Sequence, residues 1–181
     1  MGSVKLPDPA LLVVAAFSRY EEALDWVRRR LQAEFGPIVL ESPVYSFNQT
    51  DYYAASMGTE LKKLFFAAGR IDPANLADIK LRSNAWEEEY AATSGVPEAR
   101  PVNIDPGYIT PAKLVLASTK DFVHRVYLSK GIFAEVTLFY RRGVWEPHPW
   151  TFPDYREARY HPFFDRCRDY LHGIRKTETA P

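Results

Sequence analysis

The stretch that most constrains the fold is ALLVVAAF, residues 10–17, an uninterrupted apolar run of strand length. A strand that lacks a polar face must be covered on both of its faces. The run therefore predicts a central strand, with the rest of the chain arranged around it in a sheet.

Local patterns predict the elements that follow this strand. Apolar residues recur at helical spacing from Tyr20 to Phe35, and Gly36-Pro37 ends that helix. Asp72-Pro73 starts a second helix that ends before Gly95, and Thr110-Pro111 opens a short third helix. The remaining predicted elements are strands over 38–47 (interrupted by Pro43), 61–68 and 102–110 (broken at 105–107), a hairpin of 122–128 with 132–140, and a C-terminal helix over 162–174.

The order strand–helix–strand–strand–helix–strand predicts an α+β fold with a ferredoxin-like split-βαβ core. In that core, the helices pack on one face of a mainly antiparallel sheet, and a helix, a β-hairpin and a C-terminal helix extend it. The length of 181 residues fits a single domain over 1–181, ordered from about 9 to 175, with a disordered tail at 176–181.

Composition narrows the classes of partner. Lys+Arg and Asp+Glu both total 23, so bulk charge attracts the chain neither to nucleic acid nor to an anionic membrane. No apolar stretch approaches the ~20 residues of a membrane span. Cys167 is the only cysteine, which excludes an internal disulfide and indicates a reducing, cytoplasmic location. We interpret Cys167 as a core residue.

No familiar catalytic or nucleotide-binding motif is present. The nine glycines form neither G-x-x-x-x-G-K-[ST] nor G-x-G-x-x-G, and G-x-S-x-G and H-E-x-x-H are also missing. No pattern in the sequence identifies a cofactor, and whether the protein binds a metal is unknown from the sequence. An oxygen-only magnesium site at Asp51, Asp105 and Glu135 requires that folding bring the three together.

The segment TKDFVHRVYLSKG, residues 119–131, carries five ionisable groups in a strand-like frame. A three-residue loop at 129–131 places Arg125 opposite Glu135 and predicts a cross-strand ion pair on the less buried face. His124 falls in the apolar row of the other face. It is either a core histidine with a hydrogen-bond partner or an acid/base group, and the sequence leaves both interpretations open.

Polar side chains of the central block 80–135 suggest a cleft for an anionic or phosphorylated small molecule. His124 is the candidate catalytic acid/base, and the short helix predicted at Lys113 would add anion-binding amides. The hypothesis requires that Lys80, Lys113 and His124 share one cleft. Its candidate ligand-binding residues are Lys80, Arg82, Asn84, Asp105, Lys113, Lys120, Arg125 and Glu135.

The aromatic loop WEPHPWTFPDY, residues 145–155, supports an alternative from a different class. It is either a rigid strap over the core or an exposed contact surface. With the loop or an edge strand as its contact, the protein would be a non-enzymatic interaction or oligomerising module. Whether the protein is an enzyme, and whether it is a homo-oligomer, stays open.

Several segments together resemble a known family. They include TDYY…MG, DPANLADIKLRSN, PWTFPDY and the block VNIDPGYITPAKLVLASTKDFVHRVYLSKGIFAEVTLFY. They are similar to an uncharacterised bacterial family of single-domain proteins of about this length, classed as a domain of unknown function. Some members are labelled GTP-binding proteins, but this chain lacks a P-loop. The resemblance implies a bacterial cytosolic protein and assigns no catalytic residue.

Overall fold

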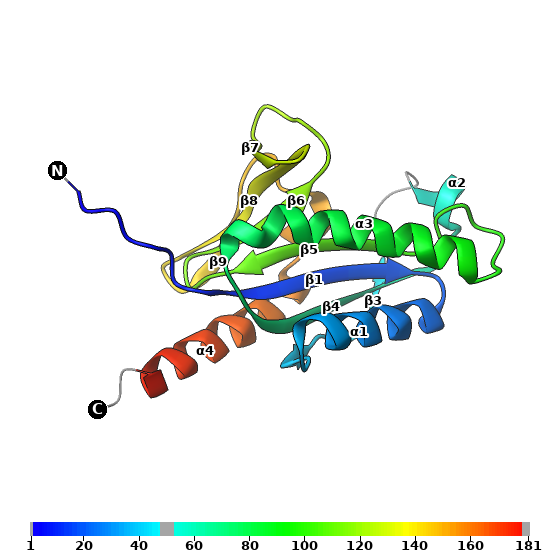
Figure 1. Ribbon diagram of the computed structural model, residues 1–181. Coiled ribbons are helices and arrows are strands. Elements are labelled where there is room, and N and C mark those ends of the chain that lie inside the picture. The colour runs from blue at the N-terminus through cyan, green and yellow to red at the C-terminus, as the bar shows by residue number, and fades with distance from the viewer. Residues whose placement is uncertain (1, 48–52, 179–181) are drawn as a thin grey trace.

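The apolar run forms strand β1 (Ala10–Ser18), every residue of which is buried, as predicted. In this computed structural model, which describes residues 2–47 and 53–178, β1 lies inside a nine-stranded sheet (Figure 1). The other strands are β2 (Leu40–Glu41), β3 (Tyr45–Phe47), β4 (Leu61–Ile71), β5 (Asn103–Ile109), β6 (Lys113–Ser118), β7 (Val126–Ser129), β8 (Ile132–Arg141) and β9 (Val144–Pro147).

The helices are α1 (Glu21–Phe35), α2 (Ala54–Met57), α3 (Leu76–Thr93) and α4 (His161–Glu178), with short 3-10 helices η2 (Pro73–Asn75), η3 (Pro153–Arg156) and η4 (Ala158–Tyr160). Three of the helices, α1, α3 and α4, are close to predicted ones. Asp72 caps η2, where its side chain accepts a hydrogen bond from the Ala74 amide at 2.9 Å. Helix α4 runs past the predicted end at residue 174 and takes in part of the predicted tail.

The sheet order is β2-β4-β1-β5-β6-β8-β7, with β3 on β4 and β9 on β8, and every pair is antiparallel. Two strand–helix–strand units, β1–α1–β2 and β4–α3–β5, therefore interleave, since each has a strand of the other between its own two strands. The α+β class is confirmed. A ferredoxin-like core is not confirmed, because the sheet contains five further strands and carries helices on both faces.

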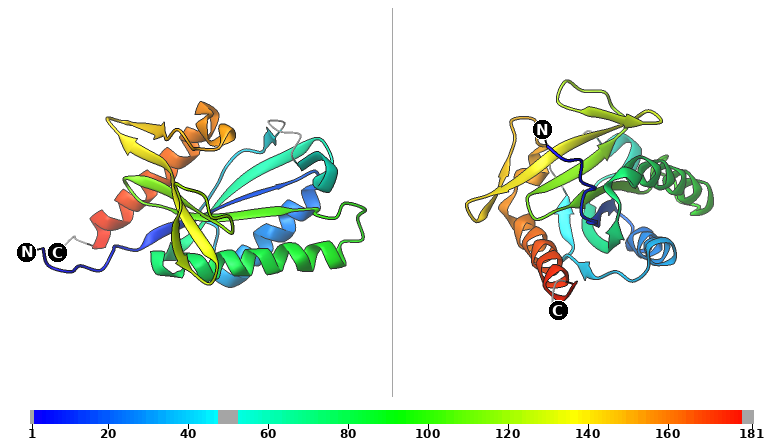
Figure 2. Two further views of the ribbon diagram at one scale, coloured as in Figure 1. Left: turned by 90° about the horizontal axis from the view of Figure 1, so that it is seen from above. Right: turned by 60° about the vertical axis from the view of Figure 1, so that its left-hand side comes forward.

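Alternate side chains of β1 point to two different cores. Leu12, Val14 and Ala16 pack against α1 and α3, whereas the odd-numbered residues from 11 to 15 pack against α4. Figure 2 shows α4 on one side of the sheet and α1 with α3 on the other. The two helices of the predicted core, α1 and α3, do share one face, and the C-terminal helix α4 covers the other face. A strand without a polar face needs a second layer, and α4 supplies it with Phe164, Cys167 and other fully buried residues.

The segment predicted as a short helix after Thr110-Pro111 is strand β6. Its side chains alternate between the α4 core, which takes Leu114 and Leu116, and a separate small cluster at the start of α3, which takes Val115 and Ala117. A short apolar run fits the period of a helix as well as that of a strand, so the sequence alone does not distinguish them. Pairing with β5 on one side and β8 on the other makes this segment a strand.

The predicted hairpin is present, but its loop differs. Tyr127 pairs with Phe133 in the predicted register, whereas the turn consists of Lys130 and Gly131, both at positive φ (54° and 78°). The row that contains His124 was predicted to be apolar and covered. It is not covered, since β7 is an edge strand and the exposed fraction of Val126 is 68%.

The aromatic loop forms a strap across the second face of the sheet. Trp145 and Tyr155 are buried in the α4 core, and the Trp145 indole Nε1 donates to Asp165 at 2.9 Å. Trp150 and Phe152 remain partly exposed. Within the described ranges, no helix has both the length and the apolar character of a membrane span.

Candidate functional site

The sheet splits between β5 and β6. Only three residue pairs join these strands, from Gly107 with Leu116 to Ile109 with Leu114. On the far side of the Gly107–Leu116 pair, the two strands no longer pair with each other. Strand β5 stays paired with β1 as far as its first residue, Asn103, and β6 stays paired with β8 as far as its last residue, Ser118. Figure 1 shows β6 and β8 rising away from the direction of β1 and β5. The separation leaves a wedge-shaped opening between two well-paired halves of the sheet.

Helix α3 supplies the hydrogen bonds that β6 no longer makes to β5. The Lys80 Nζ donates to the Ile104 carbonyl at 2.9 Å, and Glu87 accepts from the Ile104 amide at 2.7 Å. Pro106 lies two residues after Ile104 on the edge of β5 that faces the opening. A proline has no N–H to donate, and it is tolerated there because β6 is not paired with β5 at this position. The predicted break at residues 105–107 is therefore wrong, because the strand continues through Pro106.

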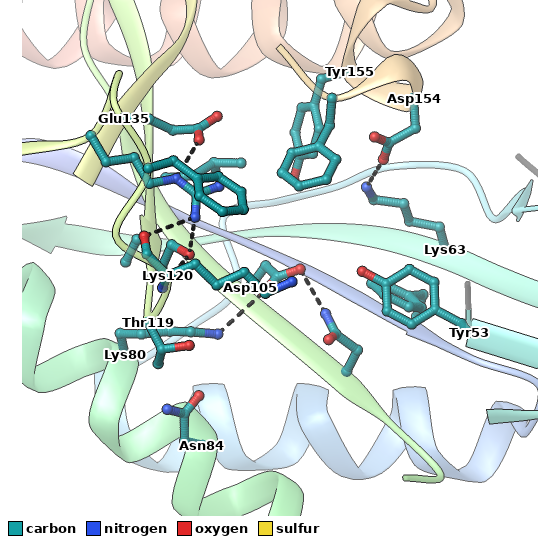
Figure 3. Close-up of a pocket in the computed structure, with 18 of the residues that line it drawn as sticks. Tyr53, Lys63, Lys80, Asn84, Asp105, Thr119, Lys120, Glu135, Asp154 and Tyr155 are labelled. Atoms are coloured by element: carbon teal, nitrogen blue, oxygen red, sulfur yellow. Dashed lines mark hydrogen bonds and ion pairs between the residues drawn. The ribbon is translucent and has the colours of Figure 1, made fainter. Parts of the chain in front are cut away.

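A cavity of about 580 Å³ occupies the opening (Figure 3). Side chains from β1, β4, β5, β6, β8, α3, the 119–125 loop and the strap contribute to its walls. Its volume lies within the range of small-molecule sites, roughly 300–1,000 Å³. The same walls carry aromatic rings and charged groups, a combination that is typical of ligand pockets.

Three ion pairs surround the cavity. Lys63 pairs with Asp154, Lys80 with Asp105 at 3.2 Å, and Arg125 with Glu135 at 2.8 Å. Arg100 and Lys120 also line it, and Arg100 pairs with Glu87 at 2.8 Å. Counted together with Glu87, five cationic and four anionic side chains leave one positive charge. The charged side chains around the cavity therefore carry a small net positive charge, which favours an anionic ligand over a cationic one.

Two of the cations retain unused donors. The Lys80 ammonium has three N–H donors and uses two, toward Ile104 and Asp105. Arg125 has five and uses three, toward Glu135, Ser118 and the Lys120 carbonyl. Asn84 also lines the cavity, and its amide has no hydrogen bond among the described residues. These groups can hold a ligand without breaking an existing contact.

Asp105 lies at the centre of the cavity and is ionised. Burial alone would raise its pKa, but the positive charges of Lys80 and Lys63 and the Asn103 amide outweigh burial and hold the pKa below its ordinary value. Lys80 donates to Oδ1, and Asn103 donates to Oδ2 at 2.6 Å. About 35% of the side chain stays exposed, so the carboxylate can still accept hydrogen bonds.

We expect Asp105 to make stability depend on pH. A carboxyl group whose folded pKa is lowered stabilises the fold above its unfolded pKa, which is about 3.9. That contribution is lost as the pH falls through the lower folded pKa. Urea unfolding measures this effect between pH 7 and pH 2. The free energy of unfolding of the wild type should exceed that of Asp105→Asn at pH 7, and the difference should shrink in the acid part of this range. A constant difference would contradict the lowered pKa.

The structure brings together six of the predicted site residues and excludes three. The cavity is lined by Lys80, Asn84, Asp105, Lys120, Arg125 and Glu135. Arg82 is exposed and pairs with Glu34 instead. Lys113 is exposed at the start of β6, where a strand replaces the predicted helix and its anion-binding amides. Because Lys80, Lys113 and His124 do not share the cavity, the original hypothesis is not retained in that form.

His124 is a hydrogen-bonded ring outside the cavity wall. Its Nε2 lies 3.2 Å from Glu135, and its ring stacks on Trp150 with centroids 5.4 Å apart. Arg125 makes the predicted contact with Glu135, but both side chains are buried rather than on an exposed face. We therefore assign no acid/base role to His124. It anchors the 119–125 loop to the strap.

Sequence reasoning missed Lys63, Arg100 and the strap residue Asp154. One signal was available, because Lys63 alternates with Leu61, Phe65 and Ala67 on an inward-facing row of β4. A lysine in such a row needs a buried acid as its partner. Asp154 comes from 91 residues further along the chain, which no local pattern could indicate.

The metal hypothesis receives no support. Asp105 and Glu135 line the same cavity, whereas Asp51 falls outside the described residues. Within 2–47 and 53–178, no cluster of three or more His, Cys, Asp or Glu side chains could hold a metal ion.

Comparison with known proteins gives one match. A family model described as Domain of unknown function (DUF4416) matches residues 8–170. The matched range covers all strands of the sheet and runs into α4. No curated protein and no solved structure matches the chain.

Proposed function

We propose a function from the cavity, because this chain belongs to the family described as Domain of unknown function (DUF4416), which supplies no activity. The proposed function is that the protein binds an anionic or phosphorylated small molecule in this cavity. The observation that carries the proposal is a set of unused hydrogen-bond donors around a ligand-sized cavity whose charged side chains, with Glu87, carry one net positive charge. Unused donors of Lys80, Arg125 and Asn84 converge on the same space. Their spread over two halves of a split sheet means that the ligand would bridge the opening.

A thermal-shift panel tests this proposal. The panel contains inorganic phosphate, sugar phosphates, polyphosphates, nucleotides and dicarboxylates. A ligand at about 100 times its Kd adds roughly 2.7 kcal/mol to stability. For a protein of this length, that corresponds to a rise in Tm of about 5–10 °C. We expect at least one phosphorylated compound to give a shift of this size.

Two variants locate the binding without disturbing a buried ion pair. Lys120→Met and Asn84→Leu each remove a cavity group, and we expect either to weaken the ligand about tenfold or more, since a charge-assisted hydrogen bond contributes roughly 1.5–3 kcal/mol. Lys113→Met is the matched control, because it removes an exposed lysine outside the cavity. A shift that survives both cavity variants but disappears in Lys113→Met would overturn the assignment.

A second candidate function is the interaction or oligomerising module. Its support is the edge strand β7, where Val126 and Tyr127 are exposed beside the fully exposed Val123. The aromatic loop supports it less, since Trp145 and Tyr155 are buried. If no anion stabilises the protein and it elutes as a dimer at micromolar concentration, this candidate replaces the first.

We further propose that the protein is bacterial and acts in the cytoplasm. The lone thiol of Cys167 is free and buried, as is common in a reducing compartment.

A further inference from the structure

The two ends of the cavity have different chemistry. Figure 3 shows Lys80, Asn84, Thr119 and Lys120 gathered at one end and Tyr53, Lys63, Asp154 and Tyr155 at the other, with Asp105 between them. One end thus presents hydrogen-bond donors and positive charge. The other is built largely from rings.

The aromatic end is a packed set of side chains. Phe17 contacts Phe47 with ring centroids 4.7 Å apart and Tyr53 with centroids 5.0 Å apart. Tyr155 and Phe152 of the strap also line the cavity. A planar ring of a ligand can enter such a wall by offset or edge-to-face contacts.

The cations near the aromatic end are already paired. Arg100, whose amide donates to the Ser56 carbonyl at 3.0 Å, pairs with Glu87 at 2.8 Å. The Lys63 Nζ lies 4.2 Å from the Tyr155 ring centroid and 5.2 Å from that of Phe47, and it pairs with Asp154. Its side chain is 2% exposed, so little of its charge faces the cavity. The anionic group of a ligand is therefore better placed at the opposite end, near Lys80 and Lys120.

The middle of the cavity favours hydrogen-bond donors. Asp105 is ionised and partly exposed there, and each of its oxygens accepts one bond from the protein. A carboxylate has about four acceptor sites, so capacity remains for hydroxyl or N–H groups. An anion at this position would be repelled by Asp105, which adds to the preference for charge at the Lys80 end.

From this arrangement, and resting on the proposed function, we propose that the ligand is an aryl-bearing anion of three parts. Its anionic group lies at the Lys80–Lys120 end, its hydroxyl or N–H groups meet Asp105, and its aromatic ring packs against Phe152 and Tyr155. A simple phosphate or an aliphatic phosphate ester fills only part of the cavity.

Four matched probes test the three parts by titration calorimetry. 4-Nitrophenyl glucoside 6-phosphate carries a ring, hydroxyls and an anion. Glucose 6-phosphate lacks the ring, 4-nitrophenyl glucoside lacks the anion, and 4-nitrophenyl phosphate lacks the hydroxyls. We expect the complete probe to bind at least about tenfold more tightly than each truncated one, because ring burial and charge-assisted bonds each contribute on that scale.

Two variants connect each part to its end of the cavity. Phe152→Ala should reduce the advantage of the complete probe over glucose 6-phosphate without changing the affinity for glucose 6-phosphate itself. Lys120→Met should weaken the binding of all three phosphorylated probes and leave that of 4-nitrophenyl glucoside unchanged. Tyr127→Ala is the control, since it removes an exposed ring outside the cavity.

The outcomes separate this inference from the proposed function. If glucose 6-phosphate binds as tightly as the complete probe, the aromatic part is wrong and anion binding stands. If 4-nitrophenyl glucoside binds as tightly as the complete probe, the cavity does not select an anion and both proposals fail. If none of the four binds, the three-part ligand is overturned, while the proposed anion binding is decided separately by the thermal-shift panel.

Discussion

Replacement of Lys63 by methionine is expected to lower the free energy of unfolding by about 3–5 kcal/mol, the usual cost of breaking a buried ion pair from one side. Lys63 and its partner Asp154 are almost completely buried. Methionine keeps much of the side-chain volume among the surrounding rings, so the loss reports on the charge. Asp154 would be left buried without its ion-pair partner. Urea unfolding at pH 7 measures the effect.

The double variant Lys63→Met/Asp154→Leu distinguishes a broken pair from a damaged core. With both charges removed, no unpaired carboxylate remains, and we expect most of the lost stability to return. If the double variant lost as much stability as the two single variants together, this explanation would be contradicted. Such a loss would mean that each side chain is needed for its shape alone.

Substitution of Gly107 by alanine is expected to destabilise the protein by about 3 kcal/mol, at the upper end of the usual cost of overpacking. A Cβ at this position would lie 2.7 Å from the Leu116 Cδ2 and closer still to the Val115 carbonyl oxygen. A backbone carbonyl in a paired strand cannot move aside as a flexible side chain can. For a chain of this length, the corresponding fall in Tm is about 6–12 °C.

Gly173→Ala is the control for this substitution. Gly173 lies within α4, and a Cβ there would meet open space. Alanine favours helix over glycine by about 0.8–1.0 kcal/mol, so we expect this variant to gain stability. Equal behaviour of the two variants would show that the close approach of β5 and β6 at Gly107 is not essential.

Elements defined by local pattern could be predicted from the sequence. The apolar run gave β1, helical spacing gave α1, and the turn at Lys130-Gly131 kept Tyr127 opposite Phe133. Strand β6 was mistaken for a helix because six residues carry too little periodicity. The position of α4 could not be predicted, since the pattern of a helix shows which of its faces is buried but not which sheet face it covers.

The candidate site depends on contacts that the sequence does not display. Polar residues of 80–135 were expected to share a cleft, and six of them do so. The split between β5 and β6, however, is a property of pairing between strands, and it decides which side chains reach the opening. Lys113 lies on β6 itself and still falls outside the cavity wall.

The central claim is that the opening between β5 and β6 binds an anion, and chemical-shift mapping of backbone amides tests it most directly. Titration of labelled protein with the best anion from the thermal-shift panel should move the amides of residues 103–105 and 116–120 together, because these segments face each other across the cavity. Amides of α1, on the far side of the sheet from the strap, should remain unchanged. Perturbations confined to β7, or spread evenly over the surface, would contradict the claim.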